Sequence, residues 1–174
     1  MSRSLIALMM FLLTFALSAC QSGEDEEEAP KKVAAAVVVP HAPTTSDDKE
    51  WKMYLQQVVS QNMAGVTDRV FPYYLPANST VPTPGDFENH SQYDRQLENV
   101  TSVLSRTVLP GNMLVFGSPD SAKMAELMIS AFSGGKPDAL KGSQVLFIGK
   151  AEDNARVKAA VEAVGAKYIF VEAK

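Results

Sequence analysis

The sequence of 174 residues contains one cysteine and two histidines, and it has no excess of basic residues. A single cysteine excludes a framework of disulfide bonds and the structural zinc sites that use several cysteines. Lysine and arginine total 16 against 20 aspartates and glutamates, a net charge of −4, whereas nucleic acids bind to basic surfaces. We therefore expect no nucleic-acid partner, no metal site and no cofactor.

Hydrophobic residues make up 46% of the chain and charged residues 21%, a balance typical of a folded globular protein. The apolar run at residues 5–16 follows Arg3 and leads through small residues to Cys20, which is the order of a secretory signal peptide. This run is shorter than the roughly 20 residues needed to span a bilayer. Residues 1–19 are therefore predicted to be a signal peptide.

The residues Leu17-Ser18-Ala19-Cys20 resemble the lipobox of bacterial lipoproteins, in which small residues precede a lipid-modified cysteine. The resemblance covers only the first twenty residues. It implies cleavage before Cys20, diacylglycerol on Cys20 Sγ, acylation of the new amine, and anchoring in the bacterial envelope. In the sorting rule of such lipoproteins, aspartate after the cysteine favours the inner membrane, so Gln21 favours the outer membrane. The domain would then face the periplasm or the cell surface.

Residues 20–46 are predicted to be a lipidated tether, because five consecutive acidic residues at 24–28 remain solvated. Within it, Val33–Val39 is apolar and is followed by Pro40. This segment could add to the domain as an edge strand, or it could bind a partner's sheet edge. It could also lie loosely on the domain as a low-complexity stretch. The candidate partner-binding residues in it are Val37, Val38 and Val39.

Residues 47–174 are expected to form one α/β domain. Helices are predicted from Asp47 to before Gly65, at 91–107, at 119–132 and at 151–164. Three continuously apolar strands are predicted at 112–117, 143–149 and 167–172, and such strands are typical of parallel sheets buried on both faces. The β-α-β-α-β order places two crossover helices on one face. The two preceding helices are then expected on the other face of a small three-layer domain with a three-stranded, mainly parallel sheet.

Residues 66–90 are predicted to be a long loop that contains four prolines and four aromatic residues. Loops of this length are usually functional or disordered, and tyrosines offer large, stiff contact surfaces. Phe71, Tyr73 and Tyr74 are therefore candidate partner-binding residues. The alternative is that these aromatic side chains fold back onto the sheet.

The strand-to-helix turns offer a second candidate site. In parallel sheets ligands bind at the carboxyl ends of the strands, where Ser118, Ser121 and Lys150 could hold a small anion. Ser118-Pro119 is also a typical helix start, with serine as N-cap and proline as the first helical residue. Residues 140–172 resemble a dinucleotide-binding unit, but Ala151 and Asn154 replace its second and third glycines. We therefore expect no dinucleotide.

Two functional hypotheses remain. The first is a non-catalytic envelope lipoprotein that binds another envelope protein or the cell wall through residues 66–90 or Val33–Val39. The second is a small ligand-binding or hydrolytic domain that uses the edge around Ser118 and Lys150. No complete catalytic motif is present in the sequence, so the sequence favours the first hypothesis and leaves enzymatic activity open.

Overall fold

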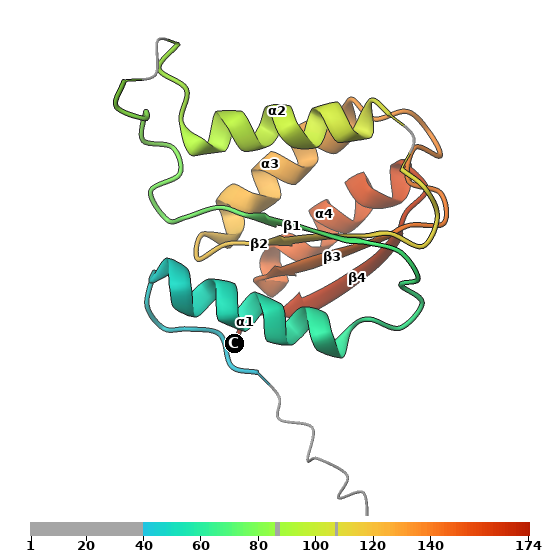
Figure 1. Cartoon of the computed structure of the whole chain (residues 1–174), viewed down its shortest axis with the longest axis horizontal. Helices are drawn as coiled ribbons and strands as arrows, with labels where there is room; N and C mark the ends of the chain where they lie inside the picture. The colour runs from blue at the N-terminus through green and yellow to red at the C-terminus, as the bar shows by residue number, and fades with distance from the viewer. Residues whose placement is uncertain (1–39, 86–87, 107) are drawn as a thin grey trace, which may run out of the picture. The chain divides into compact units, whose positions relative to one another are not determined.

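The computed structural model describes residues 40–174, apart from 86, 87 and 107 (Figure 1). Cys20 and Val33–Val39 lie outside the described residues. Four parallel strands form one sheet in the order β1-β2-β3-β4, which confirms the predicted α/β class with a parallel sheet. The strands are β1 Val70–Tyr74, β2 Met113–Gly117, β3 Gln144–Gly149 and β4 Lys167–Glu172.

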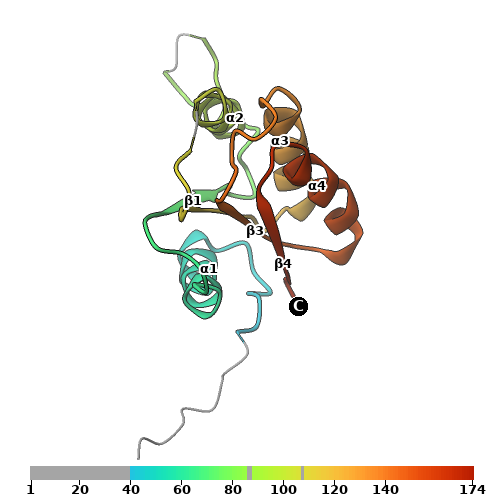
Figure 2. The ribbon, with the colours of Figure 1, turned by 90° about the vertical axis from the view of Figure 1, so that its right-hand side faces the viewer.

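Helices cover both faces of this sheet. They are α1 Asp48–Gln61, α2 Gln92–Leu104, α3 Ser121–Ser133 and α4 Ala151–Ala163. The helix α1 lies alone on one face, and α2, α3 and α4 lie on the other (Figure 2). The described chain therefore has three layers.

The prediction of a three-stranded sheet is wrong, because a fourth strand lies inside the stretch 66–90. In the parallel register of β1 and β2, Phe71 lies opposite Leu114 and Tyr73 lies opposite Phe116. Proline is rare in strands, which made residues 70–74 resemble a loop, but an edge strand tolerates a proline whose nitrogen faces outward. Pro72 occupies such a position in β1.

The predicted position of the second helix is also wrong. The helix α2 connects two neighbouring parallel strands, β1 and β2, and a right-handed crossover places it on the same face as α3 and α4. Once β1 is recognised as a strand, only α1 remains for the opposite face. The prediction of both helices on that face depended on the absence of a predicted strand before α2.

Apolar cores lie on both sides of the sheet. Leu55 of α1 packs with Ile148 of β3 on one side, and Phe116, Phe132 and Phe147 pack together on the other. Every residue of β2 and β3 is buried, as their continuous apolar sequences predict. The outer strands β1 and β4 keep partly exposed residues.

The folded domain begins before residue 47, so part of the predicted tether packs on it. The Ala42 N–H donates to the Lys174 carbonyl (N···O 2.8 Å) and the Trp51 Nε1–H donates to the Thr45 carbonyl (2.8 Å). These bonds hold residues 42–45 beside the carboxyl end of the sheet. In the described part of the chain, no helix has both the length and the apolar character needed to cross a membrane.

Candidate functional site

The structure brings Ser118, Ser121 and Lys150 together at the carboxyl ends of β2 and β3, as the sequence predicts. Ser121 Oγ accepts a hydrogen bond from the Lys150 N–H (2.8 Å) and donates one to Asp153 Oδ2 (2.6 Å). A Cβ at position 149 would lie 2.6 Å from Ser121 Oγ, so Gly149 allows this close approach. Ser121 therefore links the two strand-to-helix turns.

Asp153, the acceptor of the Ser121 hydroxyl, is 3% exposed, although it lies in the first turn of α4. The Arg156 guanidinium pairs with its other carboxylate oxygen. Buried carboxylates need partners of this kind. The pairing with Ser121 could not be predicted from the sequence, because the two residues are 32 positions apart.

Ser118 is buried, and its Oγ accepts from the Asp120 N–H (3.0 Å). The N-cap of α3 is Asp120, which accepts from the Lys123 N–H (3.0 Å), and the helix begins at Ser121. The prediction of Ser118 as N-cap is therefore wrong by two residues. Aspartate is also a favoured N-cap residue. The hydrogen bond from the Asp120 N–H to Ser118 Oγ holds the backbone of Asp120 where its carboxylate caps the helix.

The hollow beside Lys150 has a mixed electrostatic character. Its volume is about 320 Å³, and Asp120 and Glu152 line it together with Lys150. Two carboxylates next to one ammonium group oppose the binding of an anion. Among residues 40–174 that the structure describes, no group of three or more histidine, cysteine, aspartate or glutamate side chains could hold a metal ion.

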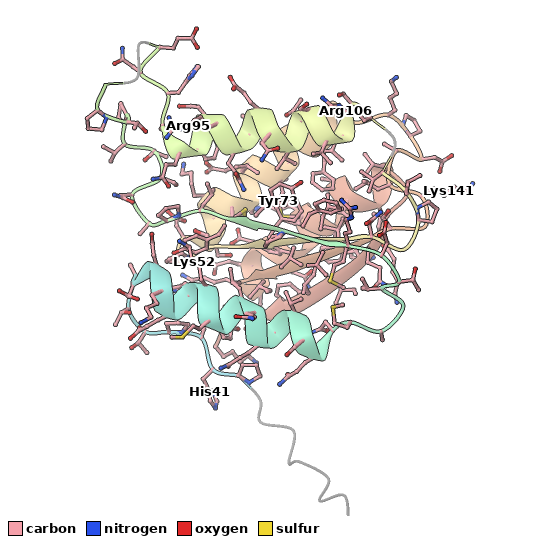
Figure 3. All side chains as sticks on the ribbon, in the orientation of Figure 1. His41, Lys52, Tyr73, Arg95, Arg106 and Lys141 are labelled. Carbon is pink, nitrogen blue, oxygen red and sulfur yellow. The ribbon has the colours of Figure 1, made fainter. Side chains whose placement is uncertain are left out.

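Tyr73 is a core residue and not part of a contact surface, so its predicted role is wrong. Its side chain is 5% exposed and stacks on Phe116, with ring centroids 4.8 Å apart and an interplanar angle of 15°. It lies between the sheet and α2 (Figure 3). Burial raises the pKa of the Tyr73 phenol above its usual value.

Tyr74 lies on the opposite face of β1 and contacts α1. Its hydroxyl donates to Asp48 Oδ1 (2.9 Å), and Lys52 Nζ lies 5.3 Å from the centre of its ring. Burial and then the bond to Asp48 raise the pKa of the Tyr74 phenol. With Leu55 and Pro72, Tyr74 lines an apolar hollow of about 510 Å³ between α1 and β1.

Phe71 is 37% exposed and lies on the α2 side of β1. We call the hollow around it, about 410 Å³ in volume, the Phe71 groove. Its apolar wall includes Leu109, which is 66% exposed. The groove is lined by Asp68, Arg69, Phe71, Val103, Arg106, Val108, Leu109 and Asn112.

Leu109 and the other α2-side residues of this groove were not predicted as site residues from the sequence. An apolar residue next to Pro110 resembles any buried loop residue. Leu109 lies in the connection between α2 and β2, where its carbonyl accepts hydrogen bonds from Asn112 Nδ2 and Ser143 Oγ while its side chain stays exposed.

The backbone of β1 is only partly available to another strand. The Met113 N–H donates to the Arg69 carbonyl and the Leu75 N–H donates to the Gly117 carbonyl, so odd-numbered residues face β2. Val70, Pro72 and Tyr74 face outward. Because Pro72 has no N–H, it interrupts the outward row of donors and protects this edge from pairing.

Comparison of the chain with known protein families, with characterised proteins and with solved structures finds no match. Its function is therefore inferred from its own residues.

Proposed function

We propose that the chain is a lipid-anchored lipoprotein of the bacterial envelope, and that its α/β domain binds another envelope protein without catalysing a reaction. The lipobox ending at Cys20 supports the anchor. The Phe71 groove supports binding, because exposed apolar surface rimmed by polar residues is typical of interaction sites.

The observation that carries this proposal is that two exposed apolar side chains, Phe71 and Leu109, line the same groove. Burying them against a partner removes apolar surface from water, at about 25 cal/mol per Å². Arg69 and Arg106 line the same groove with one carboxylate, Asp68. Arg69 Nε lies 3.9 Å from Asp68 Oδ1 and its side chain is 78% exposed, so the groove carries one more positive than negative side chain. The expected partner segment carries apolar side chains next to carboxylates.

The chemistry of the groove favours a protein over the glycan of the cell wall. Its amide side chain, Asn112, accepts from the Arg69 N–H (3.0 Å) with Oδ1 and donates to the Leu109 carbonyl (2.7 Å) with Nδ2. These bonds occupy both ends of the amide. The polar groups of the groove that remain are the charged side chains of Asp68, Arg69 and Arg106, and charged side chains of a protein segment pair with them more strongly than neutral sugar hydroxyls do.

The alternative function, ligand binding or hydrolysis at the edge around Ser118 and Lys150, receives less support. Both serine hydroxyls at this edge take part in hydrogen bonds that hold the local turns. A nucleophilic serine needs a base that accepts its proton, and the hydrogen-bond acceptor of Ser121 is a carboxylate that is already paired with Arg156.

Site-specific photocrosslinking tests the binding surface. In one variant of the full-length protein, a benzophenone amino acid replaces Phe71. In a second variant it replaces Lys158, whose side chain is exposed on α4. Both variants are expressed in bacteria and crosslinked in intact cells. We expect a discrete adduct with one envelope protein from position 71 and none from position 158.

The variant Leu109→Glu provides the matched test of specificity. Its added charge should abolish the adduct from position 71 and leave the melting temperature nearly unchanged, because Leu109 is mostly exposed. The proposal fails if the adduct persists in Leu109→Glu, or if positions 71 and 158 give the same products.

A further inference from the structure

The hollow between α1 and β1, which we call the α1–β1 hollow, has a volume of about 510 Å³. It is larger than the Phe71 groove, of about 410 Å³, and lies on the opposite face of β1. Its volume falls within the range of about 300–1,000 Å³ that small-molecule sites occupy. It is lined by Lys52, Leu55, Gln56 and Val59 of α1, by Val70, Pro72 and Tyr74 of β1, and by Val115 of β2.

The hollow exists because α1 is narrower than the sheet that it covers. Of the described helices, α1 alone lies on this face of the four strands (Figure 2). Its buried residues share one apolar core with Val115 of β2 and Leu146 of β3, in the middle of the sheet. Val70 and Tyr74 of β1 are only partly buried against this core. The α1 side of β1 is therefore left open beside the helix.

The α1 wall of the hollow changes from polar to apolar along its length. Lys52, Gln56 and Val59 follow one another at spacings of four and three residues, so they form one row on the helix. The row begins with the Lys52 ammonium group and ends with the partly buried Val59. At about 1.5 Å per residue, the row is about 10 Å long.

The β1 wall has the same direction of polarity. Tyr74, the last residue of β1, lies beside Lys52, whose Nζ is 5.3 Å from the centre of the Tyr74 ring (Figure 3). Val70, the first residue of β1, follows the connection 62–69 that leaves the end of α1, so it lies toward Val59. The hollow therefore has a polar end at Lys52 and Tyr74 and an apolar end at Val59 and Val70.

The polar end carries one positive charge. Lys52 is the one charged side chain that lines the hollow, whereas two carboxylates line the hollow beside Lys150. In the described part of the chain, no carboxylate forms an ion pair with Lys52. Asp48, one turn earlier on α1, accepts the Tyr74 hydroxyl with Oδ1 (2.9 Å). The Lys52 ammonium group is therefore available to an anion in the hollow.

We propose that the α1–β1 hollow binds a small amphipathic anion, a molecule with one carboxylate and an elongated aliphatic body. The carboxylate pairs with Lys52 Nζ through a charge-assisted hydrogen bond. The aliphatic body lies between Val59 and Val70, where the burial of apolar surface drives binding. The site and the Phe71 groove lie on opposite faces of β1, so this proposal is independent of the protein partner of the groove.

The lining of the hollow favours a small amphiphile over a protein segment. Each residue of a protein segment brings a backbone N–H and a carbonyl, and both need hydrogen-bond partners when they are buried. The hollow offers the side chains of Lys52 and Gln56, and its one hydroxyl, that of Tyr74, already donates to Asp48. An aliphatic chain needs no such partners.

Methyl NMR of the full chain in lipid nanodiscs tests the proposal with octanoate and its neutral counterpart octanamide. Empty nanodiscs measured in parallel give the partition of each compound into lipid. Octanamide should bind at least about tenfold more weakly than octanoate, because it offers Lys52 no negative charge. Octanoate should shift, saturably, the methyl resonances of Leu55, Val59, Val70 and Val115.

Two lysine variants on α1 provide a matched pair. Lys52→Met should weaken octanoate binding at least about tenfold and leave octanamide binding unchanged, because methionine keeps the apolar stem and loses the charge. Lys49→Met removes the same charge one turn earlier, outside the hollow, and should change neither affinity. Both variants should unfold at the wild-type urea midpoint, because both lysines are exposed.

Three results would overturn the proposal: no saturable shift at the lining methyl groups, equal affinities for octanoate and octanamide, or equal effects of the two lysine variants. A protein occupant would be detected separately. A discrete protein adduct from a benzophenone amino acid at Gln56, in intact cells, would assign the hollow to a protein and would also overturn the proposal. If octanoate fails to bind while position 71 still gives its adduct, this proposal falls and the proposed function of the Phe71 groove remains.

Discussion

At the scale of single residues, a polar side chain at a strand end can bind a ligand or stabilise the fold, and its hydrogen-bond partners show which role it has. Ser121 was correctly placed at the carboxyl edge of the sheet from sequence, because the strand ends of a parallel sheet meet there. Its bond to Asp153 could not be predicted, since it depends on how the turns after β2 and β3 approach each other. In the sequence Asp153 resembled an ordinary acidic residue in a first helical turn.

Replacement of Ser121 by alanine tests this structural role. Ser121→Ala removes one partner of the buried Asp153 carboxylate and one acceptor of the Lys150 N–H. We expect a loss of ~1–3 kcal/mol in the free energy of unfolding, the cost of leaving buried polar groups unsatisfied. Urea denaturation measures it. Ser133→Ala, at an exposed position with a local bond to Ser130, is the control and should change stability little. A loss below ~0.5 kcal/mol for Ser121→Ala would contradict the role of Ser121 as a link between turns.

At the scale of elements, β2, β3 and β4 could be predicted and β1 could not. The first three are continuous apolar runs bounded by glycine and helix-start signals, which is the pattern of buried parallel strands. The strand β1 contains Pro72 and is followed by Pro76, so local sequence favours a loop. Only its pairing with β2 shows that Pro72 faces outward, where a proline breaks no bond within the sheet.

The missed strand also divides the predicted aromatic contact surface. The side chains of Phe71 and Tyr73 both point to the α2 face of the sheet. Phe71 is 37% exposed near the start of β1, whereas Tyr73 is buried beneath α2. Tyr74 turns to the other face and bonds to Asp48. Of the three aromatic candidates, Phe71 therefore remains as a residue whose exposure fits partner binding at the α2 face.

Two single alanine substitutions in β1 test whether residues 70–74 form a strand or a loop. Tyr73→Ala should lower the free energy of unfolding by ~3–5 kcal/mol, because a buried aromatic side chain leaves a cavity next to Phe116. Phe71→Ala should cost less than ~1.5 kcal/mol, because its side chain is already partly in water. Urea midpoints with unchanged slopes measure both values. Equal small losses would mean that residues 70–74 do not pair as a strand.

At the scale of the whole molecule, the described domain has two different edges. The Phe71 groove lies at the β1 edge, and residues 42–45 lie against the carboxyl end of the sheet, where Ala42 bonds beyond β4. The order of the strands places these features on opposite sides of the sheet. A partner bound at β1 would therefore not meet the segment that leads to the tether. Composition alone could not predict this arrangement, because it follows from the strand order.

The location of the protein depends on a residue outside the described domain. If Cys20 is lipidated, the wild-type chain should fractionate with membranes, and its N-terminal peptide should begin at Cys20 with the mass of a diacylglyceryl and an acyl group. Acyl chains contribute ~0.8 kcal/mol per buried CH₂, so several chains anchor firmly where one does not. Cys20→Ser should yield soluble or unprocessed protein, and Gln21→Asp should keep the lipid and move the protein toward the inner membrane. Both variants should unfold at the wild-type urea midpoint, because neither residue belongs to the domain of residues 40–174. Membrane-bound wild-type protein with an unmodified Cys20 would contradict the proposed lipid anchor. The proposal that the Phe71 groove binds a protein would then stand on the crosslinking experiment alone.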